Sequence, residues 1–372
     1  MREDDGKREL AKTATGIVPL YSRSRVDRAG DAIRKGSSSV EDRLVLENWR
    51  GAHAHVINTF QATLRRRAKG TSAVVGQRLK RRPTIVDKLT RQPQMQLSRM
   101  HDIAGCRVIF DTVEQMLDFR EEFNSSRAKH DRLTAHRDQF NYLHRPKPTG
   151  YRGIHDVYKY EAYQPSAAAW NGLRIEVQFR TRVQHAWATA VEIADLLTRS
   201  RGKFNQASQE YHDFFVACSE ILARTKENSV SSWCGREDTD LLREFRRLNA
   251  ATSLLRILRR SNERIPQIPS RIVGGGLNTI LVYPFEDDGK LQGFGFRNMR
   301  VAIKRYEELE RRYDGQADIV LVRAGDLKAL KRVFQNYFTD ATDFVRYVDA
   351  GVKKLQVQNV ARSGRKIGSK AN

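Results

Sequence analysis

The sequence predicts an α+β fold, and three observations lead to this prediction. Residues 104–112 form a dense run of apolar and β-branched side chains, which is typical of a buried strand. Residues 155–163 and 173–181 alternate apolar and polar side chains across a loop of about nine residues, as an antiparallel pair of strands would. Segments with apolar residues at helical spacing stand before and after these strands.

The N-terminal elements follow from local signals. Residues 1–38 are polar and are expected to form a flexible segment. A helix should begin near Ser39, because acidic residues follow it, and apolar spacing over 39–67 predicts a helical pair. A short strand then leads through Gly76 into a basic turn and a helix near Pro83, since proline is favoured at the first helical position.

The C-terminal elements are separated by a break in the pattern. Helical periodicity continues to about residue 263, which gives a larger domain over 39–265. Residues 266–277 are rich in proline and glycine, a composition typical of a linker. Beyond it, residues 278–352 predict a small β-β-α-β-α domain, and residues 353–372 a basic disordered tail.

Composition excludes several classes of protein. No stretch reaches the roughly 18 apolar residues of a membrane helix, and the N-terminus is too charged for a signal peptide, so we expect a cytoplasmic protein. The cysteines Cys106, Cys218 and Cys234 are far apart and predict neither a zinc site nor a disulfide framework.

The charge balance predicts an anionic partner. The chain has 67 basic and 44 acidic residues, for a net charge of +23. Basic clusters lie at 64–70, 78–82 and 242–264, inside the predicted folded body. Nucleic acid is the partner that this excess favours, and a phosphorylated small substrate is the alternative.

Three cations gather at the predicted strand-to-helix junction: Arg78, Lys80 and Lys88. Backbone N–H groups at a helix start add partial positive charge, so this segment suits nucleotide phosphates. A solvated basic surface is the alternative interpretation.

Polar residues also occur in and beside the predicted strands. Asp102 directly precedes the first of them, Arg107 lies within it, and Glu176 and Gln178 share one face of a later strand. Two carboxylates near cations suit Mg²⁺ and a triphosphate. A structural ion pair or an exposed strand edge would explain the same pattern.

A third group surrounds a Pro/Gly turn. Lys147 and Tyr151 flank Gly150, and His155 follows. Such a turn can lay an aromatic ring against a nucleotide base. A packing tyrosine and a core histidine are the alternatives.

Taken in order, four segments resemble the synthetase domain of the RelA/SpoT family: GQRLKRRPTIVDKLTR, MHDIAGCRVIF, RPKPTGYRGIHDVY and RIEVQFRTRVQHAWATAVE. The resemblance covers roughly residues 40–225. It implies a mixed β-sheet with flanking helices, related to nucleotidyltransferases. It also implies a pyrophosphokinase, which transfers pyrophosphate from ATP to a ribose 3′-hydroxyl.

The resemblance assigns roles on the ATP side. Arg78 and Arg107 would stack on the two faces of the adenine, a role that a planar guanidinium fills better than lysine. Lys80 and Lys88 would hold the phosphates.

It also assigns the catalytic and acceptor-binding residues. Asp102 and Glu176 would bind Mg²⁺, Glu176 would take the proton from the attacking hydroxyl, and Gln178 would orient the acceptor ribose. The acceptor would be bound by three residues: Tyr151, on whose ring its base would stack, and Lys147 and His155 near its phosphates or sugar.

The C-terminal region, with ILVYPF and ADIVLVRAGDLKALKRVFQNYFTDATDFV, resembles the antitoxin-like domain of the fused toxin–antitoxin proteins called CapRel. That domain has a pseudo-zinc-finger fold without the metal ligands, and the lack of paired cysteines here agrees with it. The hydrolase domain of long RelA/SpoT proteins is not expected ahead of residue 40, so the chain is similar to small, synthetase-only members.

Two enzymatic functions and one binding function follow. The first is a toxic enzyme that modifies the 3′ end of tRNA, is inhibited by its own C-terminal domain, and is released by a phage protein such as a capsid component. The second is an alarmone synthetase that uses GTP or GDP. The third is a non-catalytic RNA-binding protein, which the pairing of Asp102 with Glu176 argues against.

Overall fold

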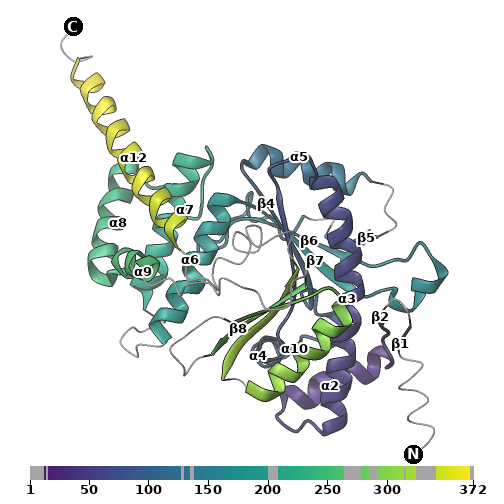
Figure 1. The fold of residues 1–372 in the computed structure, drawn as a ribbon. Coiled ribbons are helices and arrows are strands. Elements are labelled where there is room, and N and C mark those ends of the chain that lie inside the picture. Colours follow the sequence, from purple (N-terminus) through teal and green to yellow (C-terminus); the bar gives the residue numbers. More distant parts are fainter. Residues whose placement is uncertain are drawn as a thin grey trace, which may run out of the picture.

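The computed structural model describes residues 12–13, 16–126, 130–134, 138–199, 208–263, 278–284, 292–313, 316–323 and 341–368. Its centre is an eight-stranded sheet with the strand order β5-β6-β7-β4-β3-β10-β8-β9 (Figure 1). These strands are β3 (Val74–Leu79), β4 (Ala104–Phe110), β5 (Asp131–Arg132), β6 (Ile154–Lys159), β7 (Arg174–Thr181), β8 (Asn278–Pro284), β9 (Gln292–Phe296) and β10 (Ala317–Arg323). A separate two-stranded sheet joins β1 (Lys12–Thr13) to β2 (Gly16–Ile17).

Helices form two groups around the sheet (Figure 1). One group packs on or near a single sheet face: α2 (Arg23–Arg34), α3 (Val40–Ala68), α4 (Arg82–Arg91), α5 (Val113–Asn124) and α10 (Met299–Tyr313). The other group stands beside the sheet: α6 (Arg182–Arg199), α7 (Gln209–Lys226), α8 (Asp238–Thr252), α9 (Leu254–Glu263) and α12 (Thr342–Gly368). Short 3₁₀ turns occupy η1 (Leu97–Arg99) and η2 (Pro165–Trp170). None of the described helices is both long and apolar enough to cross a membrane.

The N-terminal region is more ordered than we expected. Within residues 1–38, the structure has helix α2, capped by the Ser22 hydroxyl, which accepts from Arg25 N. Val26, Ala29 and Ile33 are buried at helical spacing, so burial against α3 stabilises a segment whose many charges suggested a flexible one.

The predicted helix start at Ser39 is confirmed, but the helical pair over 39–67 is wrong. Ser39 and Asp42 form a capping box, and one continuous helix, α3, follows. A single helix is favoured because no proline interrupts the segment, and its apolar residues pack on both α2 and the sheet.

The central strands confirm the mixed sheet. β4 and β7 run parallel, whereas β3 pairs antiparallel with β4 and β6 antiparallel with β7. Along β7, Ile175, Val177 and Phe179 are fully buried on the helix-covered face, as their alternation predicted. The intervening polar residues therefore share the opposite face, where the candidate site lies.

The C-terminal strands extend this sheet rather than forming one of their own. The predicted order β-β-α-β is present as β8, β9, α10 and β10, and the predicted fifth element lies outside the described residues, as does the predicted linker. β10 pairs antiparallel with β3, with Val322 opposite Arg78 and Arg323 opposite Gln77. A pseudo-zinc-finger fold for this region stays a prediction.

The predicted disordered tail is helical over most of its length, since α12 continues to Gly368. Phe344, Val348 and Leu355 are buried against α6–α9, and Lys354 Nζ donates to the carbonyl oxygen of Thr225 at 2.9 Å. A close approach occurs at Gly351, where an added Cβ would lie 2.8 Å from Ile221 Cγ2. These contacts anchor the helix, which the basic composition alone did not predict.

Candidate functional site

The polar face of the sheet holds a cavity of about 180 Å³ between β3, β4, β7 and α6. Six of the residues predicted from sequence line it: Arg78, Lys80, Asp102, Arg107, Glu176 and Gln178. Lys88 and His155 contact the cavity residues Asp102 and Glu176. Side chains from distant segments therefore converge on one cleft, as expected.

Strand register explains this convergence. Glu176 lies opposite Gly105, and Gly105 lies opposite Arg78. Residues paired across a sheet point to the same face. Arg78 and Glu176 therefore flank Gly105, which has no side chain of its own. The nearest atom to a Cβ built at Gly105 would be the Arg78 carbonyl oxygen, at 3.5 Å, so the glycine leaves the floor of the cleft open.

Asp102 holds both lysines of the predicted phosphate site. Lys80 Nζ lies 2.9 Å from its Oδ2 and Lys88 Nζ 2.9 Å from its Oδ1. Burial disfavours the charged carboxylate, but the two ammonium groups outweigh it and hold the pKa of Asp102 below its ordinary value. Burial lowers the pKa of Lys80. The triad thus keeps two cations and one anion together before any nucleotide arrives.

Glu176 is fixed by two donors. His155 Nδ1 lies 2.9 Å from its Oε1, and Gln178 Nε2 donates to its Oε2 at 2.7 Å. Although burial opposes ionisation, these two side chains hold the pKa of Glu176 well below its ordinary value. Gln178 in turn accepts from Arg107 Nε at 3.4 Å, so the pair of strands carries a connected polar chain.

His155 links Glu176 to Tyr151. Its Nε2 lies 2.5 Å from the Tyr151 hydroxyl. Burial alone would lower the pKa of His155, but Tyr151 and Glu176 raise it to about 9. An imidazolium donates from both ring nitrogens, so at neutral pH His155 bridges the tyrosine oxygen and the carboxylate.

Tyr151 is partly buried, and its hydroxyl is bound. Besides contacting His155, the hydroxyl oxygen accepts from Arg180 Nε at 3.1 Å. The Arg180 guanidinium lies 5.1 Å and Lys147 Nζ 5.3 Å from the ring centroid, and the Trp187 ring centroid is 6.3 Å away. The ring is therefore held in place among cations. Its stacking on an acceptor base stays a prediction.

The turn that carries Tyr151 is fastened to α7. Gly150 N donates to the Lys147 carbonyl oxygen at 2.8 Å, and Gly150 has a φ of +84°, which favours glycine. A Cβ there would lie 3.1 Å from both Ser219 Cβ and Val216 Cα, and Ser219 Oγ donates to the Gly150 carbonyl oxygen at 2.6 Å.

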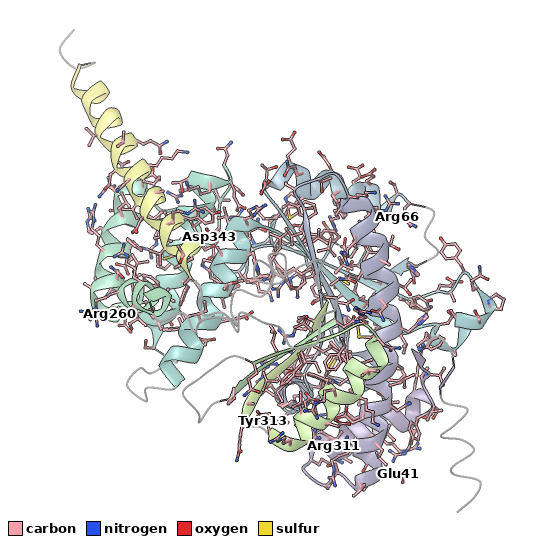
Figure 2. All side chains as sticks on the ribbon, viewed as in Figure 1. Glu41, Arg66, Arg260, Arg311, Tyr313 and Asp343 are labelled. Atoms are coloured by element: carbon pink, nitrogen blue, oxygen red, sulfur yellow. The ribbon has the colours of Figure 1, made fainter. Side chains whose placement is uncertain are left out.

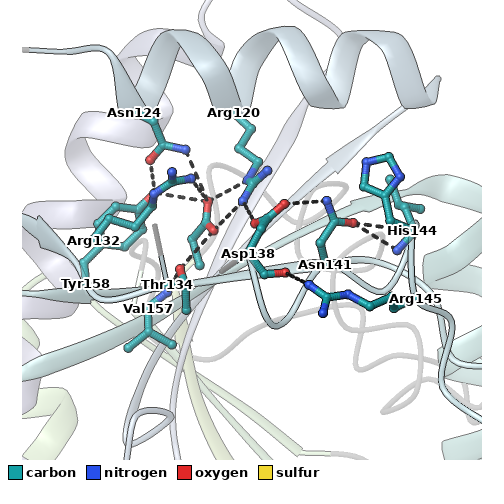
Figure 3. A network of polar contacts seen from close by, with 12 residues as sticks. Arg120, Asn124, Arg132, Thr134, Asp138, Asn141, His144, Arg145, Val157 and Tyr158 are labelled. Atoms are coloured by element: carbon teal, nitrogen blue, oxygen red, sulfur yellow. Dashed lines mark hydrogen bonds and ion pairs between the residues drawn. The ribbon is translucent and has the colours of Figure 1, made fainter. Parts of the chain in front are cut away.

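A network of polar contacts anchors the other end of this loop (Figure 3). Asp156, next to His155 and fully buried, accepts from Arg120 Nε at 2.7 Å and Arg120 Nη2 at 2.8 Å. Arg120 also pairs with Asp138, whose Oδ2 accepts from Asn141 Nδ2 at 2.7 Å. The backbone leading to Lys147 is thus tied to the sheet.

Sequence reasoning missed several residues of the site. Arg180 and Glu192 line the cavity. Arg180 shares the polar face of β7 with Glu176, and this alternation was the signal for it. Tyr142 was not predicted, although Lys147 Nζ lies 4.4 Å from its ring centroid, closer than to Tyr151. The neighbourhood of Tyr142 depends on loop packing, for which the sequence holds no periodic signal.

Arg107 lies partly buried near a second arginine. Burial and the nearby Arg180 lower the pKa of Arg107 to about 10, while Glu192 opposes this shift. Arg78 and Arg107 lie in adjacent strands and are offset by two residues across β3 and β4, with Gly105 opposite Arg78 and Gly76 opposite Arg107. An adenine-binding role for these two arginines remains a prediction.

Asp102 and Glu176 fit a magnesium ion in their chemistry. Both offer hard carboxylate oxygens at one cavity, and the charge of Glu176 partly opposes the lowering of the pKa of Asp102 by its lysine partners. Among the described residues, no group of three acidic, histidine or cysteine side chains forms a ready metal site. Mg²⁺ commonly takes one or two carboxylates and completes its shell with substrate phosphates and water, which this pair allows.

Part of the chain matches a known protein family. Residues 77–196 match the family described as "Region found in RelA / SpoT proteins". Two uncharacterized proteins, from Mycobacterium bovis and Mycobacterium tuberculosis, are each 28% identical over 190 residues, which is 50% of this chain. The chain covers 64% of the length of these curated relatives.

Solved structures with a similar arrangement include small alarmone synthetase 1 from Bacillus subtilis, with a TM-score of 0.39 and 21% identity over 47% of this chain and 89% of that one. Small alarmone synthetase 2 from the same organism gives a TM-score of 0.36 with 19% identity, covering 48% of this chain and 90% of that one. A GTP pyrophosphokinase family protein from Streptococcus pneumoniae gives a TM-score of 0.36 with 20% identity, covering 46% and 85%.

Proposed function

Residues 77–196 carry the region found in RelA / SpoT proteins, and from this premise we propose that the chain is an ATP-dependent pyrophosphotransferase. The observation that carries the proposal is the meeting of Asp102, its two lysines and Glu176 at one cleft. Such a site neutralises a triphosphate on one side and presents a carboxylate on the other.

The donor side would bind ATP through charge. Lys80 and Lys88 already face a single carboxylate, so phosphate oxygens would compete with Asp102 for their N–H groups. Arg78 and Arg107, on adjacent strands of the floor, would hold the adenine by stacking. When bound, Mg²⁺ would neutralise phosphate charge and polarise the reacting phosphorus, with Asp102 and Glu176 as its protein ligands.

Proton transfer is assigned to Glu176. Its low pKa keeps it ionised at neutral pH, so the carboxylate carries no proton when the ribose 3′-hydroxyl attacks; the same low pKa makes it a weak base, and its contribution would come from its position beside the hydroxyl. The proton leaves the hydroxyl oxygen as that oxygen bonds to the β-phosphorus of ATP, the bond to the α-phosphate oxygen breaks, and AMP departs. Gln178 and the His155 imidazolium fix the orientation of the carboxylate throughout.

The acceptor is proposed to be the 3′ end of tRNA. A net charge of +23 supports it, because a free nucleotide needs only a few cations inside its site, whereas an RNA strand is bound by a wider cationic surface. GTP or GDP is the second candidate, which would make the chain an alarmone synthetase. The presence of Tyr151 and Lys147 beside the cleft suits either acceptor.

Regulation by the C-terminal region is part of the proposal. It is supported by two contacts: β10 pairs with the strand that carries Arg78, and α12 packs on α7, which backs the acceptor turn. A displacement of β10 or α12 would therefore affect residues on both sides of the cleft. Release by a phage protein, within a toxin–antitoxin system for phage defence, rests on the resemblance to CapRel alone.

The decisive experiment uses ATP labelled at the γ-phosphate, incubated with the full chain and either tRNA or GDP. Label in tRNA supports the first acceptor, and label in guanosine nucleotides alone supports alarmone synthesis. Glu176→Gln should abolish either transfer without a large change in melting temperature. Transfer that survives this substitution would contradict the assignment of the base.

A further inference from the structure

Three arginines from distant segments meet beside the cleft. Arg174 Nη1 donates to the Arg99 carbonyl oxygen at 3.0 Å, and Arg23 Nη2 donates to the Gly172 carbonyl oxygen at 3.3 Å. The positive charges of Arg99 and Arg23 both act on Arg174. The start of β7, the 3₁₀ turn η1 and the start of α2 therefore bring three like charges together, and we call Arg23, Arg99 and Arg174 the arginine cluster.

The arginine cluster has no acidic partner in the part of the chain that the structure describes. The side chains of Arg23 and Arg174 donate to backbone carbonyl groups, which leave the positive charge uncompensated. Helical arginines elsewhere behave differently, as in the ion pairs of Arg91 with Asp87 at 2.7 Å and Arg247 with Glu244 at 2.8 Å. Grouped like charges repel, and an anion would relieve this repulsion.

The cluster lies next to the proposed reaction centre. Arg174 is two residues before Glu176 on the same face of β7, a separation of about 7 Å along a strand. The charge of Arg174 also acts on His101, which directly precedes Asp102. Yet none of the three arginines lines the cavity, and Arg23 and Arg99 are exposed. The cluster is therefore adjacent to the cleft and open to solvent.

We propose that Arg23, Arg99 and Arg174 form a phosphate-binding subsite for the backbone of an RNA acceptor strand. Guanidinium groups bind phosphate through two parallel N–H bonds, which suits an exposed cluster of arginines better than isolated ammonium groups would. The inference rests on the proposed transfer to an RNA 3′ end and names the surface that would receive the strand.

An RNA phosphate fits this position better than a phosphate of ATP. The donor's phosphates have their own cations in Lys80 and Lys88, which reach Asp102 inside the cleft. A free guanosine nucleotide would occupy the cavity and the Tyr151 turn. Only an acceptor that continues beyond its terminal nucleotide would reach exposed arginines outside the cavity.

The test measures RNA binding by fluorescence anisotropy without ATP, using a labelled single-stranded RNA of about twelve nucleotides with a free 3′-hydroxyl. The variant is Arg99→Gln combined with Arg174→Gln. Loss of charge-assisted bonds should weaken binding about tenfold or more. The slope of log affinity against log salt should also fall in magnitude by about 1.4, because two cations are removed and each contact with a single strand contributes about 0.7. Arg174→Lys keeps the positive charge but loses the planar guanidinium group. Its RNA affinity should therefore lie between those of the unaltered chain and the double variant.

A matched control removes the same charge elsewhere. Arg311→Gln combined with Arg312→Gln alters two exposed arginines on α10 that do not line the cavity; Figure 2 labels Arg311. Its RNA affinity should stay within about twofold of the unaltered chain. An equal loss in this control, or an unchanged affinity in the cluster variant, would overturn the subsite.

Two further measurements distinguish binding of an RNA phosphate from binding of a phosphate of ATP. The affinity of the cluster variant for ATP, measured by calorimetry, should match that of the unaltered protein; a loss as large as the RNA loss would assign the arginines to the donor and overturn the proposal. If RNA binding depends on the cluster but no label reaches RNA, the subsite holds and the proposed transfer to RNA is wrong.

Discussion

Arg50 donates a hydrogen bond from Nε to the backbone carbonyl oxygen of Lys80, at 2.8 Å. The same guanidinium pairs with Glu310 of α10 at 3.0 Å and lies 4.7 Å from the Tyr306 ring centroid. Burial opposes its charge, but Tyr306, Glu310 and Glu47 raise the pKa of Arg50. One buried side chain therefore connects a C-terminal helix to the residue that would hold the phosphates of ATP.

Replacing Arg50 should weaken both stability and donor binding. Arg50→Met leaves Glu310 nearly buried without its partner, which should lower the free energy of unfolding by about 3 kcal/mol. Because the bond to the Lys80 carbonyl is lost, KM for ATP should rise more than KM for the acceptor. Steady-state kinetics and denaturant unfolding check both effects. Glu308→Gln, in an exposed pair with Arg305, is the matched control and should change neither.

Substitutions at Tyr151 separate the ring from its hydroxyl. If the ring stacks on the acceptor base, Tyr151→Ala should raise KM for the acceptor about tenfold or more and leave ATP affinity unchanged. Tyr151→Phe keeps the ring but loses the contacts with His155 and Arg180, so its acceptor KM should change much less. Equal damage from both substitutions would assign the role to the hydroxyl.

The His155 contribution to stability should depend on pH in a defined direction. The pKa of His155 is raised from 6.5 to about 9, so the stabilisation from its positive charge is full below pH 6.5 and lost as pH rises through about 9. The free energy of unfolding of the metal-free and nucleotide-free protein, compared with that of His155→Gln, should therefore differ most near pH 6 and converge above about pH 10. A difference that does not change with pH would argue against an imidazolium between Glu176 and Tyr151.

The buried carboxylate of Asp156 should support the acceptor loop. Asp156→Asn removes the charge that faces Arg120 and, at 3.7 Å, Arg132, and should cost about 3–5 kcal/mol of stability. Because Arg120 also holds Asp138 at the start of the loop, KM for the acceptor should rise in the protein that still folds. Asp131→Asn, on the exposed strand β5, should leave both quantities near their original values.

Site residues were predictable where a charged or polar side chain stands out within the pattern of a buried strand. Asp102, Arg107, Glu176 and Gln178 stood out because charged groups interrupt or alternate with buried strand residues, and the register of β4 and β7 brings them together. The contact of His155 with Glu176 was not visible in the sequence, because it depends on which residues of β6 and β7 lie side by side.

The fold was predictable in its central strands and less so at its ends. Helix α2 and most of α12 are rich in charge, and their order comes from burial of a few apolar residues against distant helices. The joining of β10 to β3 carries no local signal, because any strand with a free edge offers the same backbone groups. Arg50 was missed for a related reason: its partners come from three separate segments.

The pairing of β10 with β3 has a consequence for how the protein is made. Residues of β3 leave the ribosome early, and those of β10 only after most of the chain has been translated. Until then the strand that carries Arg78 is an open edge, free to pair with another polypeptide, and Arg50 lacks Glu310. A nascent chain therefore gains a finished donor pocket late in its synthesis, and such long-range pairing predicts slow folding.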